Sequence, residues 1–283
     1  MSDISNSISR RRLLGSTFHY AACLLLVLIV LFPLSWVLFG SFKSPSEIFA
    51  YPPSILPQQP TLQNYSEVIT RTGLPVYMMN TTIVTVVTVV LTLFFGSMAA
   101  YGFSRWNFRF KNVLLVTLLI FQLIPSSVNI IPFYLMASWA DMLNSRITLI
   151  AIYSATQIPF VIWIMKGIID SIPRSLDEAA IIDGCSWARV FFSIILPLSL
   201  PGLAASGFLV FLHSWSEFVL PLVLAGSNDV AVVSVGIYRF FGMDTSAYNY
   251  AFAASVLSSL PVLIGYLFAQ EFLVSGLTKG SDK

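Results

Sequence analysis

Six long stretches of this 283-residue chain are almost entirely apolar. Each can cross about 30 Å of hydrocarbon as an α-helix, since one crossing takes about 20 residues. A helix pairs its backbone N–H and C=O groups internally, which a bilayer requires because its interior offers no water to bond them. We therefore predict an all-α membrane protein with six transmembrane helices, at residues 18–39, 79–103, 113–137, 147–165, 196–218 and 248–272.

The composition excludes several classes of protein. Hydrophobic residues make up 57% of the chain and charged residues only 10%, whereas an ordinary soluble domain is about 25% charged. This excludes a simple soluble enzyme and a disordered chain. A net charge of +2 leaves no large basic surface for a polyanion, so no nucleic-acid partner is expected. The two cysteines, Cys23 and Cys185, do not form a disulfide framework or a metal set.

The basic residues indicate the orientation of the chain. Eleven of the 15 lie in segments that are cytoplasmic if the N-terminus is inside: Arg10, Arg11, Arg12, Arg105, Arg109, Lys111, Lys166, Arg174, Arg189, Lys279 and Lys283. The four in outside segments are Lys43, Arg71, Arg146 and Arg239. The positive-inside rule then predicts that both termini are cytoplasmic. Tails at residues 1–17 and 273–283 would flank a six-span domain at 18–272, with one large inside loop at 166–195.

Polar residues within or beside the spans are candidates for a translocation pathway. Pro125, Asn129 and Pro132 interrupt the third span, which indicates either a packing kink or irregular backbone beside a polar cavity. Gln122 can share a helix face with Asn129. Glu217 is expected near the outer end of the fifth span, where it either bonds a neighbouring helix or lines the outer pathway. The candidate pathway residues are therefore Gln122, Asn129 and Glu217.

The large inside loop carries strong local helix signals. Ser175 and Glu178 have the spacing of a capping box, and Gly184 suits the left-handed position that ends a helix of about two turns. A second helix is expected from about Ser186, and its apolar stripe comprises Trp187, Val190, Phe191 and Ile194. Pro197 and Pro201 mark its bend into the fifth span.

The first of these helices predicts a binding surface. Ala179 and Ala180 are small enough to let another backbone approach closely, and Glu178 and Asp183 flank them. Such a helix either lies on the lipid surface or binds a protein. Acids outnumber bases across residues 174–183, which is unfavourable beside an anionic leaflet and favours a protein partner.

The loop resembles the EAA signature of binding-protein-dependent ABC importer permeases. The resemblance rests on Glu178-Ala179-Ala180-Ile181-Ile182-Asp183-Gly184 with Phe191 and Leu196-Pro197-Leu198. Further short motifs along the chain resemble the carbohydrate-importer branch, in the pattern of maltose-transporter G-subunit-like members: Ser41-Phe42-Lys43, Asn64-Tyr65, Ala99-Ala100-Tyr101-Gly102, Leu143-Asn144-Ser145 and Gly276-Leu277-Thr278. Cys185 and Ser216 depart from the pattern, where the family usually has alanine and asparagine.

The resemblance implies a coupling helix, between spans four and five, that sits in a groove of a cytoplasmic ATPase. Its motif positions here are Glu178, Ala179, Ala180, Asp183 and Gly184. It also implies a multi-pass protein of the prokaryotic inner membrane, with two ATPase copies, a second and different permease, and an extracytoplasmic solute-binding protein as partners. The outside segment 225–247 would either probe that protein's ligand cleft or dock as an interfacial helix.

The expected function is that of a permease subunit of an ATP-driven importer for a sugar, oligosaccharide or polyol derivative. The sequence contains no phosphate-binding loop, so ATP and Mg²⁺ are expected on the partner ATPase and no cofactor on this chain. It shows no nucleophile–base pair or metal cluster, and no enzymatic activity is expected. The alternative is an ion- or proton-coupled secondary carrier of a small solute.

Outside the membrane, the proline-rich segment 40–77 predicts an ordered but irregular loop.

Overall fold

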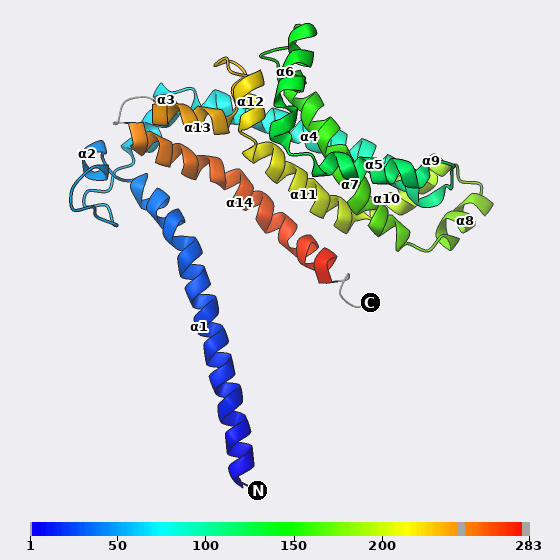
Figure 1. Ribbon diagram of the computed structural model, residues 1–283, viewed down its shortest axis with the longest axis horizontal. Helices are drawn as coiled ribbons and strands as arrows, with labels where there is room; N and C mark the ends of the chain where they lie inside the picture. Colours follow the sequence, from blue (N-terminus) through cyan, green and yellow to red (C-terminus); the bar gives the residue numbers. More distant parts are fainter. Residues whose placement is uncertain (1, 243–246, 279–283) are drawn as a thin grey trace. The chain divides into compact units, whose positions relative to one another are not determined.

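The computed structural model of the chain describes residues 2–242 and 247–278, and every regular element in them is helical (Figure 1). This confirms the predicted all-α class. The elements are α1 (Ser2–Gly40), α2 (Pro45–Ile48), α3 (Gln63–Arg71), α4 (Leu74–Arg105), α5 (Lys111–Leu123), η1 (Ser126–Asn129), α6 (Ile130–Trp139), α7 (Arg146–Asp170), α8 (Ser175–Ile182), α9 (Trp187–Val190), η2 (Phe191–Ile195), α10 (Leu196–Leu198), α11 (Leu200–Ser216), α12 (Val219–Leu224), α13 (Val233–Gly242) and α14 (Tyr248–Thr278).

Among the described residues, four helices are long and apolar enough to cross a membrane: α1 from His19 onward, α4, α7 and α14 as far as Phe272. The other two predicted spans are broken. The third bends by 88° between α5 and the 127–139 segment, and the fifth bends by 78° between the 187–198 segment and α11. If each bent pair is one span, the number reaches the predicted six. The predicted interruption of the third span, 113–137, is present, because the chain leaves the helix after Leu123 and turns at Pro125.

The ends of the chain differ from plain tails. The predicted N-terminal tail at 1–17 is part of α1 from Ser2 onward, and the predicted C-terminal tail begins inside α14. Residues 279–283, with the predicted inside residues Lys279 and Lys283, lie outside the described residues.

The chain divides into two compact units, and the first contains the residues up to Arg71 together with Phe240–Leu257. Buried Asn64 organises this unit: its side-chain amide donates to the carbonyls of Ser41 and Lys43, both at 2.8 Å, and its Oδ1 accepts from Asn249 at 2.6 Å. Within 40–77, the helices α2 and α3 replace part of the loop predicted to be irregular. On α3, hydrogen bonds from Tyr250 and then Gln63 hold the pKa of Glu67 below its ordinary value.

The second unit contains Thr72–Arg239 and the chain from Ser258 onward. In it α4 packs against both α7 and α11 (Figure 1). The buried face of α4 consists largely of small or hydroxyl-bearing residues: Thr81, Thr85, Thr88, Thr92, Gly96, Ser97 and Ala100. Small residues let helix backbones approach closely in a membrane. At Gly96 a Cβ atom would lie only 2.6 Å from Val161 Cγ1 of α7.

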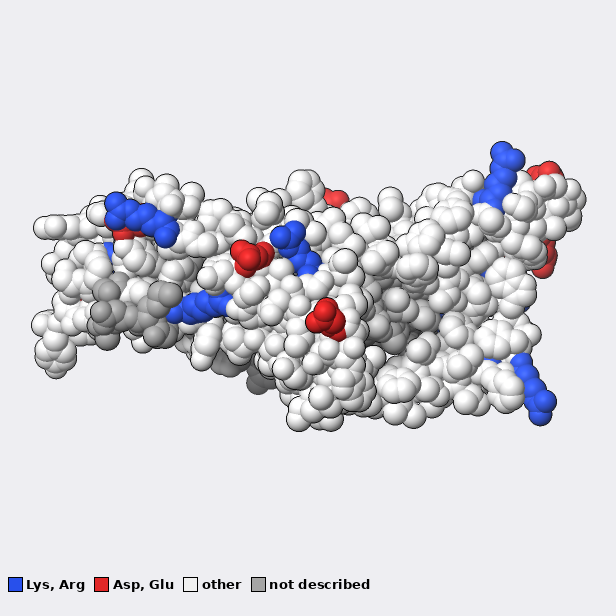
Figure 2. All heavy atoms as spheres, turned by 90° about the horizontal axis from the view of Figure 1, so that it is seen from above, with Lys and Arg blue, Asp and Glu red and all other residues white. Residues whose placement is uncertain are grey.

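Much of the surface is apolar. Leu24, Leu28 and Phe32 of α1 expose 57–61% of their area, and on the face drawn in Figure 2 the charged side chains are isolated spots on an uncharged surface. Apolar patches of this extent mark contact with lipid or with another protein rather than with water.

Candidate functional site

The helix α8, predicted as a coupling helix, forms where the sequence places it, but its N-terminus is built differently. The predicted capping box at Ser175 is wrong: Ser175 is the first helical residue, and the cap position is Arg174, in helical conformation and without a side-chain cap bond. The reason is that the chain already turns at Pro173, whose carbonyl accepts from the Leu176 amide at 3.3 Å. The position that a capping serine needs is therefore inside the helix.

The C-terminus of α8 confirms the predicted glycine turn. Gly184 has φ +84°, the left-handed conformation in which glycine carries no Cβ penalty. Its amide donates to Ile181 O at 3.0 Å, and the Cys185 amide donates to Ala180 O at 2.9 Å. These two bonds form a Schellman motif, which closes α8 sharply. Ser186 then accepts from the Arg189 amide at 3.4 Å and starts α9, as predicted.

The two sides of α8 have different environments. Asp177 and Ala180 are buried, with 2% and 7% of their area exposed. Ala180 packs in the protein's own core, so this one of the five motif residues does not lie on an open surface. We call five exposed residues the outer face of α8: Leu176, Glu178, Ala179 and Ile182 of the helix and Asp183 at its C-terminal cap. Ile182 is 85% exposed, and the sequence analysis did not single it out.

Asp177 is held by two residues of α4. Tyr101 donates from its hydroxyl to Asp177 Oδ1 at 2.8 Å, and Arg105 Nε forms an ion pair with Oδ2 at 2.9 Å. The two charged side chains are only 5% and 3% exposed, so solvent screens this pair little. The sequence reasoning missed it. The i, i+4 spacing of Tyr101 and Arg105 places them on one helix face, but no local signal names Asp177 as their partner.

Arg105 also binds the end of α7. Its guanidinium donates through Nη1 to Ile169 O at 3.2 Å and through Nη2 to Ile172 O at 3.1 Å. Ile169 lies in the last turn of α7, where helix carbonyls are left without intrahelical partners, and Ile172 lies in the connection 171–174 to α8. One arginine therefore links α4, α7 and α8.

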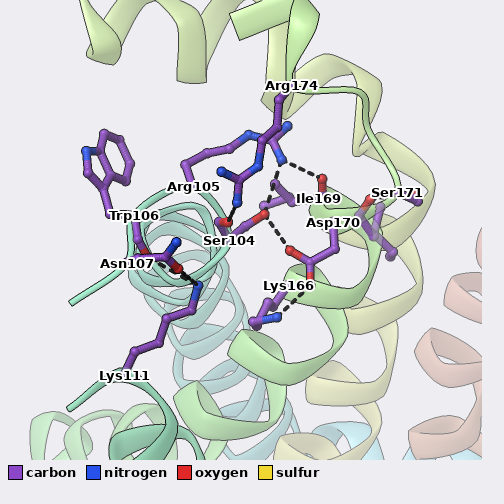
Figure 3. Close-up of polar contacts among 11 residues, drawn as sticks. Ser104, Arg105, Trp106, Asn107, Lys111, Lys166, Ile169, Asp170, Ser171 and Arg174 are labelled. Carbon is purple, nitrogen blue, oxygen red and sulfur yellow. Dashed lines mark hydrogen bonds and ion pairs between the residues drawn. The ribbon is translucent and has the colours of Figure 1, made fainter. Parts of the chain in front are cut away.

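A second set of contacts lies beside this arginine (Figure 3). Ser104 donates from its hydroxyl to Asp170 Oδ1 at 2.6 Å, and its carbonyl accepts from Arg174 Nη2 at 2.8 Å. Lys166 pairs with the other oxygen of Asp170 at 2.5 Å. The carboxyl-terminal ends of α4 and α7 are thereby joined at several points.

Aromatic packing covers the polar junction. The ring centroids of Tyr101 and Phe191 are 5.2 Å apart, and those of Trp106 and Trp187 are 4.9 Å apart. Val190, Phe191 and Ile195 are buried with Ala180 in one cluster. Trp187, expected on the same stripe, is instead 46% exposed.

A cavity of about 640 Å³ lies in the second unit. Its polar lining residues are Gln122, Asn129, Thr156, Gln157 and His213. Phe121 and Phe133 add aromatic surface to the same walls. Two of the three predicted pathway residues are thus brought together, at the break between α5 and α6, which favours the cavity interpretation of that break over a simple packing kink. Gln157 and His213 come from α7 and α11, and no local signal in the sequence singles out Gln157.

Glu217 is not among the residues that line this cavity. It caps α11, and its Oε1 accepts from the amides of Val219 at 3.1 Å and Leu220 at 3.3 Å, at the start of α12. Its Oε2 lies 4.0 Å from Nε2 of His213, which does line the cavity. The predicted alternative of a hydrogen bond to a neighbouring helix describes its contacts best.

The segment 225–247 contains a regular helix, α13, and is not an irregular loop where it is described. Residues 243–246 lie outside the described part. Arg239 donates to Asn228 Oδ1 at 2.6 Å, to the Tyr77 hydroxyl at 3.3 Å and to the carbonyl of Gly226. These bonds tie α13 to the start of α4 within the second unit.

Comparison with known proteins gives a consistent result. Residues 92–279 match the family described as "Binding-protein-dependent transport system inner membrane component". The chain is 31% identical to the probable ABC transporter permease protein YurM of Bacillus subtilis, over 99% of this chain and 93% of that protein. It is also 31% identical to the maltodextrin transport system permease protein MalD of Streptococcus pneumoniae, over 99% and 100% of the two chains.

The same fold occurs in a solved structure. A chain from the crystal structure of a bacterial ABC transporter involved in the import of the acidic polysaccharide alginate aligns with a TM-score of 0.79 and 22% identity, over 90% of this chain and 96% of that one. A second structure, of a bacterial alginate ABC transporter in complex with an alginate pentasaccharide-bound periplasmic protein, aligns with a TM-score of 0.67 and 16% identity, over 89% and 92%.

Proposed function

The chain belongs to the family of binding-protein-dependent transport system inner membrane components, and on this premise we propose that it is a permease subunit that imports a carbohydrate with energy from ATP. The observation that carries the substrate class is similarity over nearly the whole chain to permeases named for maltodextrin and galactooligosaccharides. The substrate is therefore a sugar, an oligosaccharide or a related polyol derivative.

The proposed assembly has several parts. This chain forms a heterodimer with a second permease in the inner membrane of a prokaryote, with both termini cytoplasmic and six spans. Two cytoplasmic ATPase subunits bind ATP and Mg²⁺, and an extracytoplasmic solute-binding protein delivers the sugar. A structural neighbour solved with a periplasmic protein supports the last partner.

The outer face of α8 is the proposed ATPase contact. An exposed isoleucine, Ile182, lies beside the exposed acids Glu178 and Asp183. A large apolar side chain combined with charges that can orient a partner is typical of a protein interface rather than of a lipid-facing helix. Ala179 leaves room for close approach, and the turn at Gly184 fixes where the surface ends.

The cavity is the proposed passage for the sugar through this subunit. Amide groups on Gln122, Asn129 and Gln157 can exchange hydrogen bonds with sugar hydroxyls, and Phe121 and Phe133 offer flat apolar faces to sugar rings. A helix broken at membrane depth beside a cavity is a recurrent feature of transporter binding sites. Glu217 acts on this passage indirectly, through His213 and the start of α12.

Purification of the tagged chain from its own membranes tests the proposal. We expect the ATPase and the second permease to co-purify, and reconstituted vesicles to take up at least one of maltodextrin, galactooligosaccharide or diacetylchitobiose in an ATP-dependent, vanadate-sensitive way. Uptake driven by a proton gradient, with no ATPase in the preparation, would refute it and support a secondary carrier.

The coupling surface is tested separately by Glu178→Lys, which we expect to abolish ATPase co-purification. The matched control is Asp229→Lys, the same charge reversal at an exposed acid of the segment predicted to lie outside. Full ATPase recovery with Glu178→Lys would exclude the outer face of α8 as the contact.

A further inference from the structure

Resting on the proposed function, we infer that Arg105 is a positioning residue that fastens α8 to α4 and α7, so that a displacement imposed on the outer face of α8 reaches both spans together. The inference concerns the buried side of α8. The proposed ATPase contact uses the opposite, exposed side, so the two sets of residues can be varied independently.

The buried side of α8 is fixed to α4 through Asp177. Asp177 presents both carboxylate oxygens to α4, one to the Tyr101 hydroxyl at 2.8 Å and the other to Arg105 Nε at 2.9 Å. The hydrogen bond from Tyr101 restrains the direction of the carboxylate, and the close ion pair with Arg105 adds electrostatic attraction. Tyr101 and Arg105 are one turn apart on α4, so the contact resists both sliding and tilting of α8 along that helix.

The guanidinium of Arg105 also forms hydrogen bonds at the end of α7. Its two terminal nitrogens donate to carbonyls on each side of the end of α7, at Ile169 and Ile172. The planar arginine fork suits several partners in fixed directions, which a lysine cannot do. The connection 171–174 is therefore tied down at Ile172, and the carbonyl of Ser104 binds Arg174 at its other end.

The junction between Arg105 and Asp177 is shielded from water. Arg105 and Asp177 are 5% and 3% exposed, and Tyr101 packs on Phe191 and Trp106 at centroid distances of 5.2 and 5.4 Å. Water that entered the junction could replace each bond and let the helices slip. In this packed setting the polar contacts instead behave as a rigid link, and a push on α8 moves the ends of α4 and α7 with it.

The helix α7 connects this junction to the wall of the cavity. From this junction α7 runs through Gln157 and Thr156, which line the cavity, and it packs along α4. Displacement of α8 would therefore reach the walls of the cavity, which is the connection that an ATP-driven importer requires between its energy source and its passage.

The experiment uses the whole complex and needs no identified sugar. Cys23 and Cys185 are replaced by Ser and Ala, and Leu123→Cys, at a 75%-exposed residue of the cavity wall, is the reporter. Its alkylation rate by a water-soluble maleimide is measured without nucleotide and after trapping with ATP and vanadate. We expect the two rates to differ about fivefold or more, the lower end of typical coupling between distant sites.

Asp177→Asn, which keeps the shape of the side chain but removes its charge, should bring the ratio of the two rates to about one while the amount of trapped nucleotide is unchanged. Tyr101→Phe, which removes one bond and keeps the ring packing, should reduce the ratio partially. Asp229→Asn is the control and should leave it unaltered. An Asp177→Asn complex with the reference ratio would overturn the inference.

A loss of trapped nucleotide that parallels the loss of the ratio in both variants would also overturn it, because Arg105 would then serve only general stability. Failure of the inference is distinguishable from failure of the proposed function. In the first case the ATPase co-purifies and the ratio does not respond to these variants, and in the second no ATPase co-purifies with the unaltered chain.

Discussion

Asp177 and Glu178 are neighbours in sequence, yet one is buried beside Arg105 and the other is exposed. The helix accounts for this, because successive side chains on it point about 100° apart. Both acids suit the first turn of a helix for the same electrostatic reason. Their separate roles, one fixed to α4 and one open to a partner, follow only from the tertiary packing.

The difference predicts unequal costs of substitution. Asp177→Ala should destabilise the protein by about 3–5 kcal/mol, since it leaves the Arg105 charge buried without its partner. Glu178→Ala should change stability by no more than about 0.5 kcal/mol, as is usual for exposed positions. Denaturation of the detergent-solubilised chain, followed by tryptophan fluorescence, measures both. Equal midpoints for the two variants would contradict the assignment of Asp177 as an anchor.

The glycine turn after α8 makes a second prediction at this scale. Gly184→Ala should cost about 1–2 kcal/mol, because φ +84° is strained for a residue with a Cβ. Nothing lies within 4 Å of the added atom, so sterics with neighbours do not contribute. Gly184→Asn should cost less, since asparagine tolerates this conformation.

Gly167 provides the control for that substitution. It lies inside α7, has no positive φ and is equally free of neighbours within 4 Å. Gly167→Ala should therefore leave the denaturation midpoint unchanged or raise it. A Gly167→Ala variant as unstable as Gly184→Ala would indicate that added bulk, and not backbone conformation, is the cause.

At the level of helices, the sequence predicts where helices form better than it predicts where they bend or break. All six apolar stretches are mostly helical in the described residues, because hydrophobic length and the need to pair the backbone leave little choice. Pro125 indicates a break in the third stretch, but not the 88° bend between its halves. That angle depends on what the two halves pack against, which no local pattern encodes.

The region of α8 and α9 shows the same contrast between local sequence signals and tertiary contacts. The end of α8 at Gly184 and the start of α9 at Ser186 follow from turn chemistry and are predicted correctly. The start of α8 is not, because Pro173 sets the turn before Ser175 can act as a cap. The link between Asp177 and Arg105 joins residues far apart in the chain and has no signature in the sequence.

Close packing of α4 on α7 makes a prediction of its own. Gly96→Ala should destabilise the protein by about 1–3 kcal/mol, since its Cβ would lie 2.6 Å from Val161 Cγ1 and the helices must separate. Adding Val161→Ala removes the nearer clashing atom, Cγ1, but keeps Val161 Cβ at 2.9 Å, so it should restore part of the loss. Gly102→Ala, on the same helix but with nothing within 4 Å, should be neutral. Denaturation midpoints of these three variants and of Val161→Ala alone check the pattern, and additive losses in the double variant would argue against the contact.

For the whole molecule, the scarcity of charged residues indicates that most of the surface faces lipid or another subunit. The few buried charges lie where helix ends meet, as at Arg105 and Asp177. Charged residues are 10% of the chain, and the exposed apolar surface on α1 requires lipid or another subunit beside it. The cavity also depends on residues that are far apart in the sequence. Its amides and imidazole come from α5, η1, α7 and α11, so no single stretch of sequence reveals that they meet.

The proposed passage of a sugar through that cavity predicts that a variant of its wall can lose transport while ATP hydrolysis is unchanged. Gln157 is 6% exposed and lines the cavity, and Gln157→Leu keeps its approximate volume while removing both hydrogen-bonding groups. We expect uptake of the best-transported oligosaccharide to fall about tenfold, the effect of losing roughly 1.4 kcal/mol of hydrogen bonding.

The matched control is Gln270→Leu, the same change on α14 at a residue that donates to Leu267 O at 3.1 Å and does not line the cavity. It should transport normally. ATP hydrolysis and ATPase co-purification should be equal in both variants, because neither residue touches the α8 junction. If Gln157→Leu imported every oligosaccharide at the unaltered rate, the sugar would have to cross elsewhere, at surfaces of the second permease rather than along α7 of this chain.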